Sequence, residues 1–385
     1  MESFDFIRCK LNYFTFAALC IPSPKVNHEI FMQRCHQLAK LGQGFVAPNP
    51  MVGAVLVHNK KVIGEGYHKK HGGPHAEVNC IQHAITNGFE NLLDKSTIYV
   101  SLEPCAHFGK TPPCADLIIK HKIPNAVIGC RDPFLEVDGR GIEKLKQAGI
   151  HVFEGILEQE SKALNKRFFF FHQHHKPFVI LKWAQTADDF IGNAGDERLL
   201  ISNDITNRLV HKWRSQESAI LVGTNTALKD DPQLTNRFWT GAHPVRLVID
   251  FKNILPATHK IFSGEAPTII FNYDRHTITE GLKFPGFENI TYWYKLDGQR
   301  SSVSEIMDAC YKLGIQSILV EGGARLQQSF IDENSWNEAR SITNPDLLIQ
   351  SGISAPVLKD VESILHQESG NDRISYFYAH TQTGK

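Results

Sequence analysis

The sequence lacks an excess of charge of either sign. Its 385 residues carry 41 Lys and Arg against 41 Asp and Glu. A protein that binds the phosphate backbone of nucleic acid without regard to sequence needs a clear surplus of cations. We therefore expect no nucleic-acid partner, and an enzyme that edits bases in RNA or DNA is disfavoured.

Long apolar runs are also scarce. Residues 11–21 follow Arg8 and Lys10 and resemble the apolar region of a signal peptide, but they are too short to span a bilayer. No small-residue cleavage site follows them. We expect no membrane partner and a cytoplasmic protein. Residues 1–27 are interpreted as an N-terminal extension, and whether they belong to the mature chain stays open.

The eight cysteines are irregularly spaced and lack the pattern of a disulfide framework. In a reducing compartment their thiols are free to bind metal. The length of the chain and its hydrophobic content of 42% are enough for two domains with separate cores.

Predicted strands and helices alternate along both halves of the chain. A helix is predicted from His28 and a β-hairpin over residues 52–67, followed by helices and strands in turn. This alternation indicates a layered α/β domain with a largely parallel sheet. A second α/β series begins at residue 178, so we place the two domains at residues 28–172 and 173–385.

The stretch FFFFHQHH lies at this boundary. Its histidines, His172, His174 and His175, could form a metal cluster, but no cysteine or carboxylate joins them at ligand spacing. A polar linker with incidental histidines is the favoured interpretation, and the phenylalanines are expected to pack at the domain edge.

Two motifs of the first half carry candidate metal ligands. The motif HAE contains His75 and Glu77, and the motif PCAHFGKTPPC contains Cys105 and Cys114. Alone, each has a structural explanation, since a histidine near a helix start is usually a cap and Pro-Cys is usually a turn. Together they supply the His, Cys and Cys ligands of a catalytic zinc, with Glu77 placed to carry protons. A purely structural zinc site, which fills all four positions with protein, is disfavoured.

The spacing of the two cysteines narrows the choice among families of zinc deaminases. Pro-Cys-x-x-Cys is usual in zinc deaminases, whereas eight residues separate Cys105 from Cys114. With the segments APNPMVG, GEGYH and DPFLEVDGRGI, this long loop resembles the deaminase half of RibD, the family of bifunctional riboflavin-biosynthesis deaminase/reductases. The resemblance implies a three-layer α/β/α cytidine-deaminase-like domain, zinc on the three ligands named above, and Glu77 as the catalytic proton shuttle. It also implies that Asn49 binds the pyrimidine and that His107 lies in a loop facing the substrate.

The second half lacks the G-x-G-x-x-G motif of a Rossmann domain. Gly322 and Gly323 nevertheless stand between a predicted strand and a predicted helix, where backbone N–H groups can meet a phosphate. A plain strand-to-helix turn is the commoner explanation of such a pair.

Four segments of this half, LKWAQTADDFIG, KWRSQESAILVGTNTALKDDPQLTNR, VRLVID and SILVEGG, resemble the reductase half of RibD. The resemblance runs from about residue 177 to the C-terminus and implies a dihydrofolate-reductase-like α/β domain that uses NADPH. The positions that match NADP contacts are Ala184, Leu200, Thr226, Asp230 and Gly323. The positions that match contacts to the phosphoribosyl substrate are Arg198, Arg214, Leu234, Arg237 and Glu321.

Some of these positions have structural alternatives or depart from the family. Arg214 could be an ordinary ion-pair partner, although guanidinium suits phosphate, and Asp230 could cap the turn before Pro232. Asp189 stands where the family has glycine, in a turn that prefers positive φ. Leu200 stands where the family has an aromatic residue. Both departures bear on the efficiency of the reductase.

The resemblance as a whole implies a bifunctional enzyme. Its first domain would remove the 2-amino group of 2,5-diamino-6-(5-phosphoribosylamino)pyrimidin-4-one. Its second would use NADPH to reduce 5-amino-6-(5-phosphoribosylamino)uracil to the ribitylamino compound. A zinc deaminase whose second domain only binds a ligand is the alternative. The expected partner is this small phosphoribosyl pyrimidine, and assembly into a homo-oligomer stays open.

Overall fold

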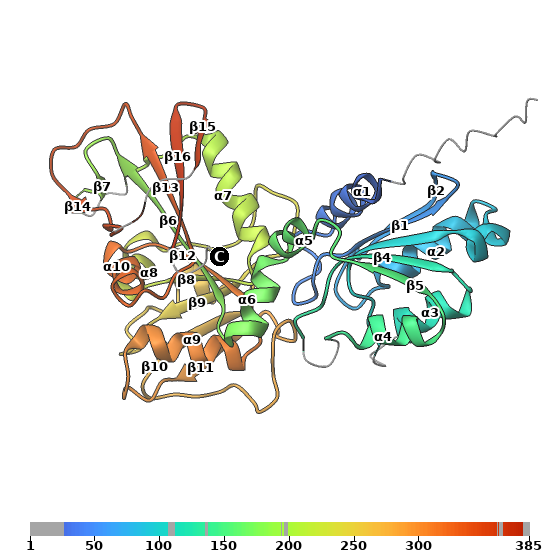
Figure 1. Ribbon diagram of the computed structural model, residues 1–385. Helices are drawn as coiled ribbons and strands as arrows, with labels where there is room; N and C mark the ends of the chain where they lie inside the picture. The colour runs from blue at the N-terminus through green and yellow to red at the C-terminus, as the bar shows by residue number, and fades with distance from the viewer. Residues whose placement is uncertain are drawn as a thin grey trace, which may run out of the picture.

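Two main β-sheets divide the chain into two halves (Figure 1). The computed structural model describes residues 27–106, 112–134, 138–193, 195, 199–359, 361 and 365–379. The apolar run at residues 11–21 lies outside this part of the chain. Among the helices described, none combines the length and the apolarity that a membrane span requires.

The N-terminal half holds a five-stranded sheet in the order β2-β1-β3-β4-β5. Its strands are β1 (Gly53–His58), β2 (Lys61–Tyr67), β3 (Thr97–Leu102), β4 (Asn125–Cys130) and β5 (His151–Glu154). Its helices are α1 (His28–Lys40), α2 (Ala76–Thr86), α3 (Cys114–Lys120), α4 (Arg140–Gln147) and α5 (Glu158–Leu164), with the 3-10 helix η1 (Glu90–Lys95). β1 is antiparallel to β2 and β3, whereas β3, β4 and β5 are parallel. The predicted first helix, the hairpin and the alternating elements after it are confirmed.

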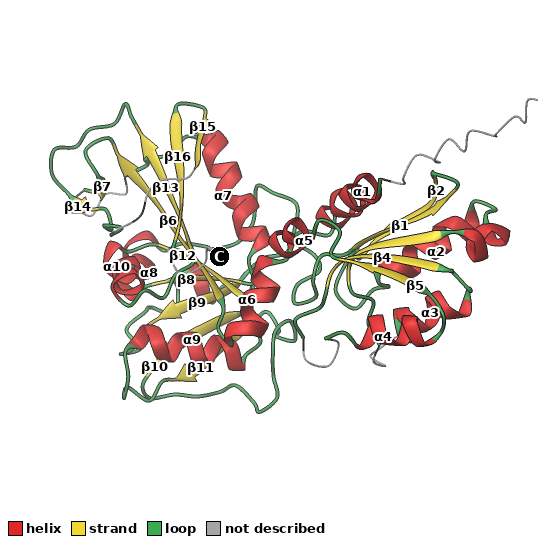
Figure 2. Cartoon of the chain, in the orientation of Figure 1, coloured by secondary structure: helices red, strands yellow, loops and turns green. Residues whose placement is uncertain are grey.

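Helices cover both faces of this sheet, because its strands are apolar on both sides (Figure 2). In β1, Ala54 and Leu56 pack with residues of α2, α3 and α4, whereas Val55 and Val57 pack with residues of α1. Successive side chains of a strand point to opposite faces, and burial of one Val or Leu contributes about 1.5–3 kcal/mol. The N-terminal half is therefore the three-layer α/β/α domain that was expected.

The C-terminal half is built on a nine-stranded sheet in the order β11-β10-β9-β8-β12-β6-β13-β16-β15, with a separate β14-β7 pair. The strands are β6 (Phe178–Thr186), β7 (Phe190–Gly192), β8 (Ala219–Val222), β9 (Val245–Ile249), β10 (Thr268–Asn272), β11 (Thr291–Lys295), β12 (Ser317–Glu321), β13 (Glu338–Asn344), β14 (Ile353–Ser354), β15 (Leu365–Ser369) and β16 (Asp372–Tyr378). The helices are α7 (Asp204–Gln216), α8 (Thr224–Asp230), α9 (Ser302–Lys312) and α10 (Ala324–Asp332), with the 3-10 helix η2 (Lys260–Phe262). In this order, every pair of neighbouring strands from β11 through to β13 is parallel. Strand β16 is antiparallel to β13, and β15 is antiparallel to β16.

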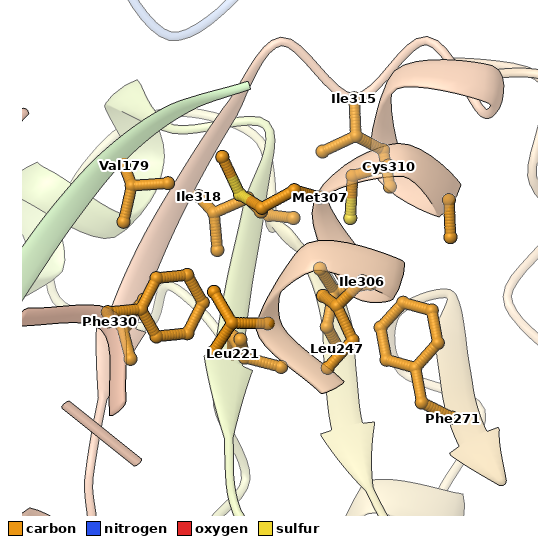
Figure 3. Packing of buried hydrophobic residues seen from close by; sticks show 14 of the residues in the cluster. Val179, Leu221, Leu247, Phe271, Ile306, Met307, Cys310, Ile315, Ile318 and Phe330 are labelled. Atoms are coloured by element: carbon orange, nitrogen blue, oxygen red, sulfur yellow. The ribbon is translucent and has the colours of Figure 1, made fainter. Parts of the chain in front are cut away.

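The largest core of the molecule lies between this sheet and α9 (Figure 3). Met307 and Cys310 on α9 pack in one cluster with Leu221 of β8 and Leu247 of β9. The core fixes the parallel strands, so that the carboxyl ends of β6, β8 and β12 meet at one edge of the sheet. Ligands of open α/β sheets bind outside this kind of edge.

Helix α6 (Lys166–His174) joins the two halves, at the place where a polar linker was predicted. That prediction is wrong, because four consecutive phenylalanines point to different sides of a helix and supply apolar surface to both halves of the chain. Phe168 and Phe169 join a cluster of the N-terminal half, and Phe170 joins a cluster of the C-terminal half, which confirms their expected packing. The proposed domain boundary at residue 172 thus falls inside α6. In the described part of the chain, the histidines of this stretch form no metal-binding group.

Candidate active sites

The three candidate zinc ligands come from the starts of two helices and from one loop. His75 is the N-cap residue of α2, and its side chain makes no capping hydrogen bond, which leaves the imidazole free. Cys105 follows the end of β3, and Cys114 is the first residue of α3. The backbone N–H of Cys114 donates to Cys105 Sγ over 3.3 Å, so the helix start also orients the other cysteine.

The ligand atoms of these residues fit a zinc ion. His75 Nδ1 lies 3.7 Å from Cys105 Sγ and 3.3 Å from Cys114 Sγ, and all three ligand atoms lie within 4.8 Å of one another. Zinc–nitrogen and zinc–sulfur bonds of tetrahedral geometry would set the nitrogen and sulfur atoms about 3.6 Å apart. A hydrogen bond with Cys114 lowers the pKa of the Cys105 thiol to about 4, against the opposing effect of burial. The donor set thus contains a thiol prepared to ligate as thiolate.

Glu77 lies in the first turn of α2, two residues after the ligand His75. Its side chain is 3% exposed. Burial, assisted by the charge of Cys105, raises the pKa of Glu77 to about 7. A carboxyl group of this kind can accept and return a proton near neutral pH.

One cavity of about 820 Å³ brings Glu77, His75 and Cys105 together with Asn49. Asn49 Nδ2 donates to Nε2 of His68 over 3.0 Å, and Nδ1 of His68 donates to the carbonyl of Pro74 over 3.0 Å. The histidine thereby fixes the amide of Asn49 at the cavity wall. His107 lies outside the described residues.

Two residues of this site were missed by sequence reasoning. His68 belongs to the segment GEGYH, but no spacing rule connected it to Asn49. Glu103 stands in the motif LEPC and accepts hydrogen bonds from the backbone N–H groups of residues 132, 139, 141 and 142 over 2.9–3.3 Å. It anchors the loop after β4 beside the zinc ligands. The sequence feature that could have identified Glu103 is an acidic residue at the end of an apolar strand. A charge in such a position is buried only when hydrogen-bond partners stabilise it.

In the C-terminal half, Arg214 and Glu321 are joined by two hydrogen bonds of 2.8 Å each. Lys182, the neighbour of Glu321 across β6 and β12, donates to the same carboxylate over 3.2 Å. Although burial opposes its ionisation, Arg214 and Lys182 hold the pKa of Glu321 well below its usual range. Arg214 is thus an ion-pair partner in this structure, and Lys182 is a further residue that sequence reasoning missed.

Arg237 lies in the same network. Its backbone N–H donates to Nδ1 of His211 over 2.9 Å, and its Nη1 donates to the Thr235 hydroxyl over 3.1 Å. Arg214 Nη1 reaches the Thr235 carbonyl over 3.3 Å. Lys182 and Arg214 both bond the carboxylate of Glu321, and Arg237 is joined to Arg214 through Thr235. Guanidinium groups gathered in this way suit a phosphate group.

The carboxyl edge of the sheet also has a cradle formed by glycine. Gly322 and Gly323 follow β12 with φ of +110° and +75° and lead into α10. A Cβ on Gly322 would lie 2.7 Å from Cγ2 of Thr226, and one on Gly323 would lie 3.3 Å from Oγ1 of Thr226. The backbone approaches Thr226 this closely only because side chains are absent, and the start of α10 offers N–H groups to a phosphate. These residues fit a nucleotide cofactor.

The remaining predicted reductase positions are dispersed around this edge. Ala184 is partly buried in β6, and Asp230 ends α8. Leu234 is 3% exposed and packs in the core, so its backbone is the part that could meet a ligand. Leu200 is 77% exposed. Arg198 lies outside the described residues.

Asp189 adopts the positive φ that was expected of its turn. Its φ is 62°, and Gln185 Nε2 donates to its carboxylate over 2.6 Å. The neighbouring Asp188 accepts hydrogen bonds from the Thr186 hydroxyl and from the backbone of Gln350. Aspartate tolerates left-handed backbone better than most residues, and these bonds hold the turn without glycine.

Family models match both halves. The model described as "Cytidine and deoxycytidylate deaminase zinc-binding region" matches residues 25–130, and the model described as "RibD C-terminal domain" matches residues 177–354. The first agrees with a His, Cys and Cys donor set, and the second with the half that holds the glycine cradle.

Curated relatives match almost the whole chain. Riboflavin biosynthesis protein RibD of Aquifex aeolicus is 37% identical over 320 residues, which cover 83% of this chain and 87% of that protein. RibD of Actinobacillus pleuropneumoniae is 36% identical, with coverage of 88% and 90%.

Solved structures agree on the arrangement of both halves. The deaminase/reductase of Thermotoga maritima superposes with a TM-score of 0.80 at 35% identity, covering 91% of this chain and 98% of that one. RibD of Acinetobacter baumannii gives a TM-score of 0.81 at 30% identity and the same coverage. The triad fits zinc, the glycine cradle fits a nucleotide, and the relatives match both halves, so zinc and NADPH are the cofactors. The chain belongs to the RibD family of bifunctional riboflavin-biosynthesis deaminase/reductases.

Proposed function

We propose that the N-terminal half hydrolytically removes the 2-amino group of 2,5-diamino-6-(5-phosphoribosylamino)pyrimidin-4-one. The observation that carries this is the meeting of His75, Cys105 and Cys114 beside the buried Glu77. Zinc held by the triad would supply an activated water for attack on the ring carbon. Glu77 takes the proton of that water and delivers it to the ring nitrogen and then to the departing ammonia. Asn49, held by His68, binds the pyrimidine edge.

The C-terminal half then reduces 5-amino-6-(5-phosphoribosylamino)uracil to the ribitylamino product, with NADPH as the source of hydride. The cofactor contacts are Ala184, Leu200, Thr226, Asp230 and Gly323. The substrate contacts are Arg198, Arg214, Leu234, Arg237 and Glu321. The two cations bonded to Glu321 and the glycine cradle beside Thr226 support this division. The Thermotoga relative carries both activities in its name.

A cytoplasmic location is part of the proposal. The six cysteines in the described part of the chain are free thiols. Free thiols, two of them metal ligands, suit a reducing compartment.

The deciding experiment incubates the purified protein with the diaminopyrimidine substrate, with and without NADPH, and follows ammonia and cofactor absorbance together. Glu77→Gln is expected to lower ammonia release by about 10²- to 10⁴-fold while zinc content and NADPH oxidation with the deaminated compound persist. Glu90→Gln, at an exposed acid of the same half, is the matched control. Undiminished ammonia release by Glu77→Gln would reject the proposed role.

A further inference from the structure

The cavity of the zinc triad is walled in part by the other half of the chain. Alongside Asn49, His75 and Glu77, its lining includes Lys283 and Lys312 of the C-terminal half. Phe284, Tyr311, Gly314 and Gln316 complete this second wall. Residues of the C-terminal half therefore form part of the wall of the cavity that holds the zinc triad.

Contacts across the two halves hold this wall in place. The Tyr311 hydroxyl lies 2.7 Å from Nδ1 of His175, and its ring packs against Phe171 of α6 at 5.0 Å between centroids. Phe171 lines the same cavity. The end of α9 is thus fastened to the helix that borders the zinc site.

Lys283 and Lys312 belong to two segments that run side by side. The backbone N–H of Phe284 donates to the Leu313 carbonyl over 2.8 Å, which ties the residue after Lys283 to the residue after Lys312. A Cβ built on Gly314 would lie 3.6 Å from Cβ of Lys283. The two lysine side chains therefore start from adjacent points of one wall.

The charges on this wall lack a protein counterion. Within the described residues, neither Lys283 nor Lys312 has an ion pair. They are also the only Lys or Arg among the described residues that line the cavity. Neighbouring like charges repel each other, and a dianion such as a phosphate monoester would relieve that repulsion. Around the triad, by contrast, the lining includes the carboxyl groups of Glu77, Glu103 and Asp132, which repel a phosphate when they are ionised.

We propose that Lys283 and Lys312 bind the phosphate of the deaminase substrate while its pyrimidine ring lies against Asn49 and Glu77. This inference rests on the proposed function, which supplies a substrate with an uncharged ring at one end and a phosphate at the other. The C-terminal half thus completes the binding site of the N-terminal half, as well as carrying its own reaction.

The test compares ammonia release from the phosphorylated substrate and from its dephosphorylated ribosylamino analogue. Lys283→Gln/Lys312→Gln is expected to raise KM for the phosphorylated compound roughly tenfold or more, because both charge-assisted hydrogen bonds to the phosphate are lost. kcat and the KM for the dephosphorylated analogue should stay the same. Lys283→Arg/Lys312→Arg should restore most of the affinity, and Lys295→Gln, at an exposed lysine of β11, should change neither constant.

Folding is checked by the NADPH-dependent reduction of the deaminated compound, because Lys312 precedes β12 whereas Glu321 and Gly322 stand at its far end. An equal loss with both compounds, or no change with either, would overturn the inference and leave the proposed deaminase intact. If the unaltered enzyme released no ammonia from the phosphorylated compound, the proposed function would fail first, and this inference with it.

Discussion

Arg214 on α7 and Glu321 at the end of β12 form a double hydrogen bond in which each N···O distance is 2.8 Å. Both side chains are mostly buried, at 14% and 9% exposure. Removing the carboxylate charge leaves Arg214 and Lys182 buried without a counterion. We expect Glu321→Gln to lower the free energy of unfolding by about 3–5 kcal/mol. Urea denaturation measures this, with Glu280→Gln, at an exposed glutamate of the same half, as the control. A loss below about 1 kcal/mol, the range of exposed ion pairs, would contradict the burial argument.

Zinc is expected to serve only one of the two reactions. Stripping the metal with a chelator should abolish ammonia release and leave the NADPH-dependent reduction unchanged, because the triad lies wholly in the N-terminal half. Cys114→Ser should lower bound zinc well below about one ion per chain, measured by atomic emission. Cys130→Ala changes another buried thiol of this half and should retain the metal. A full complement of zinc in Cys114→Ser would show that the ion is held elsewhere.

The glycine cradle makes a prediction about NADPH affinity. Gly322→Ala would place a Cβ 2.7 Å from Cγ2 of Thr226 and would push Thr226 or the backbone out of position. We expect the dissociation constant for NADPH, measured by fluorescence titration, to rise about tenfold or more, which corresponds to about 1.4 kcal/mol. Gly281→Ala imposes a similar backbone strain, at φ of +81°, with no atom within 4 Å of the added Cβ. Equal affinity losses in both variants would attribute the effect to backbone strain alone.

His211 makes the stability of the C-terminal half depend on pH. Burial, with Arg214 and Arg237 nearby, lowers the pKa of His211 to about 4 from an ordinary value of 6.5. Below pH 6.5 the unfolded chain takes up a proton on this imidazole, whereas the folded chain does so only near pH 4. The free energy of unfolding should therefore fall as the pH is lowered through this window.

His211→Asn preserves an acceptor for the backbone N–H of Arg237 and removes the titration. In this variant the slope of unfolding free energy against pH, between pH 6.5 and 4.5, should decrease by about one proton. Denaturant titrations at several pH values provide the slopes. Identical slopes for the two proteins would assign the pH dependence to other groups.

The elements and the zinc triad could be predicted from the sequence because both rest on local patterns. Apolar spacing fixed the helix at His28 and the strands, and His75, Glu77, Cys105 and Cys114 carry a chemistry that few other arrangements share. What could not be predicted depends on contacts between distant segments. Three interactions become visible only once the strands are paired: the hydrogen bond between His68 and Asn49, and the bonds that Lys182 and Arg214 donate to Glu321. The phenylalanine helix was misjudged because the polar histidines that follow it suggested a linker, whereas the phenylalanines pack into the cores of both halves.

Helix α6 contributes Phe168 and Phe169 to the core of one half and Phe170 to that of the other. Residues 175–177 alone separate its end from the start of β6. The two halves of this chain therefore share one helix as part of both of their hydrophobic cores. A cut at the proposed boundary would uncover apolar surface on whichever fragment loses the helix. Separate production of the two activities would have to assign these nine residues to one half and replace their packing in the other.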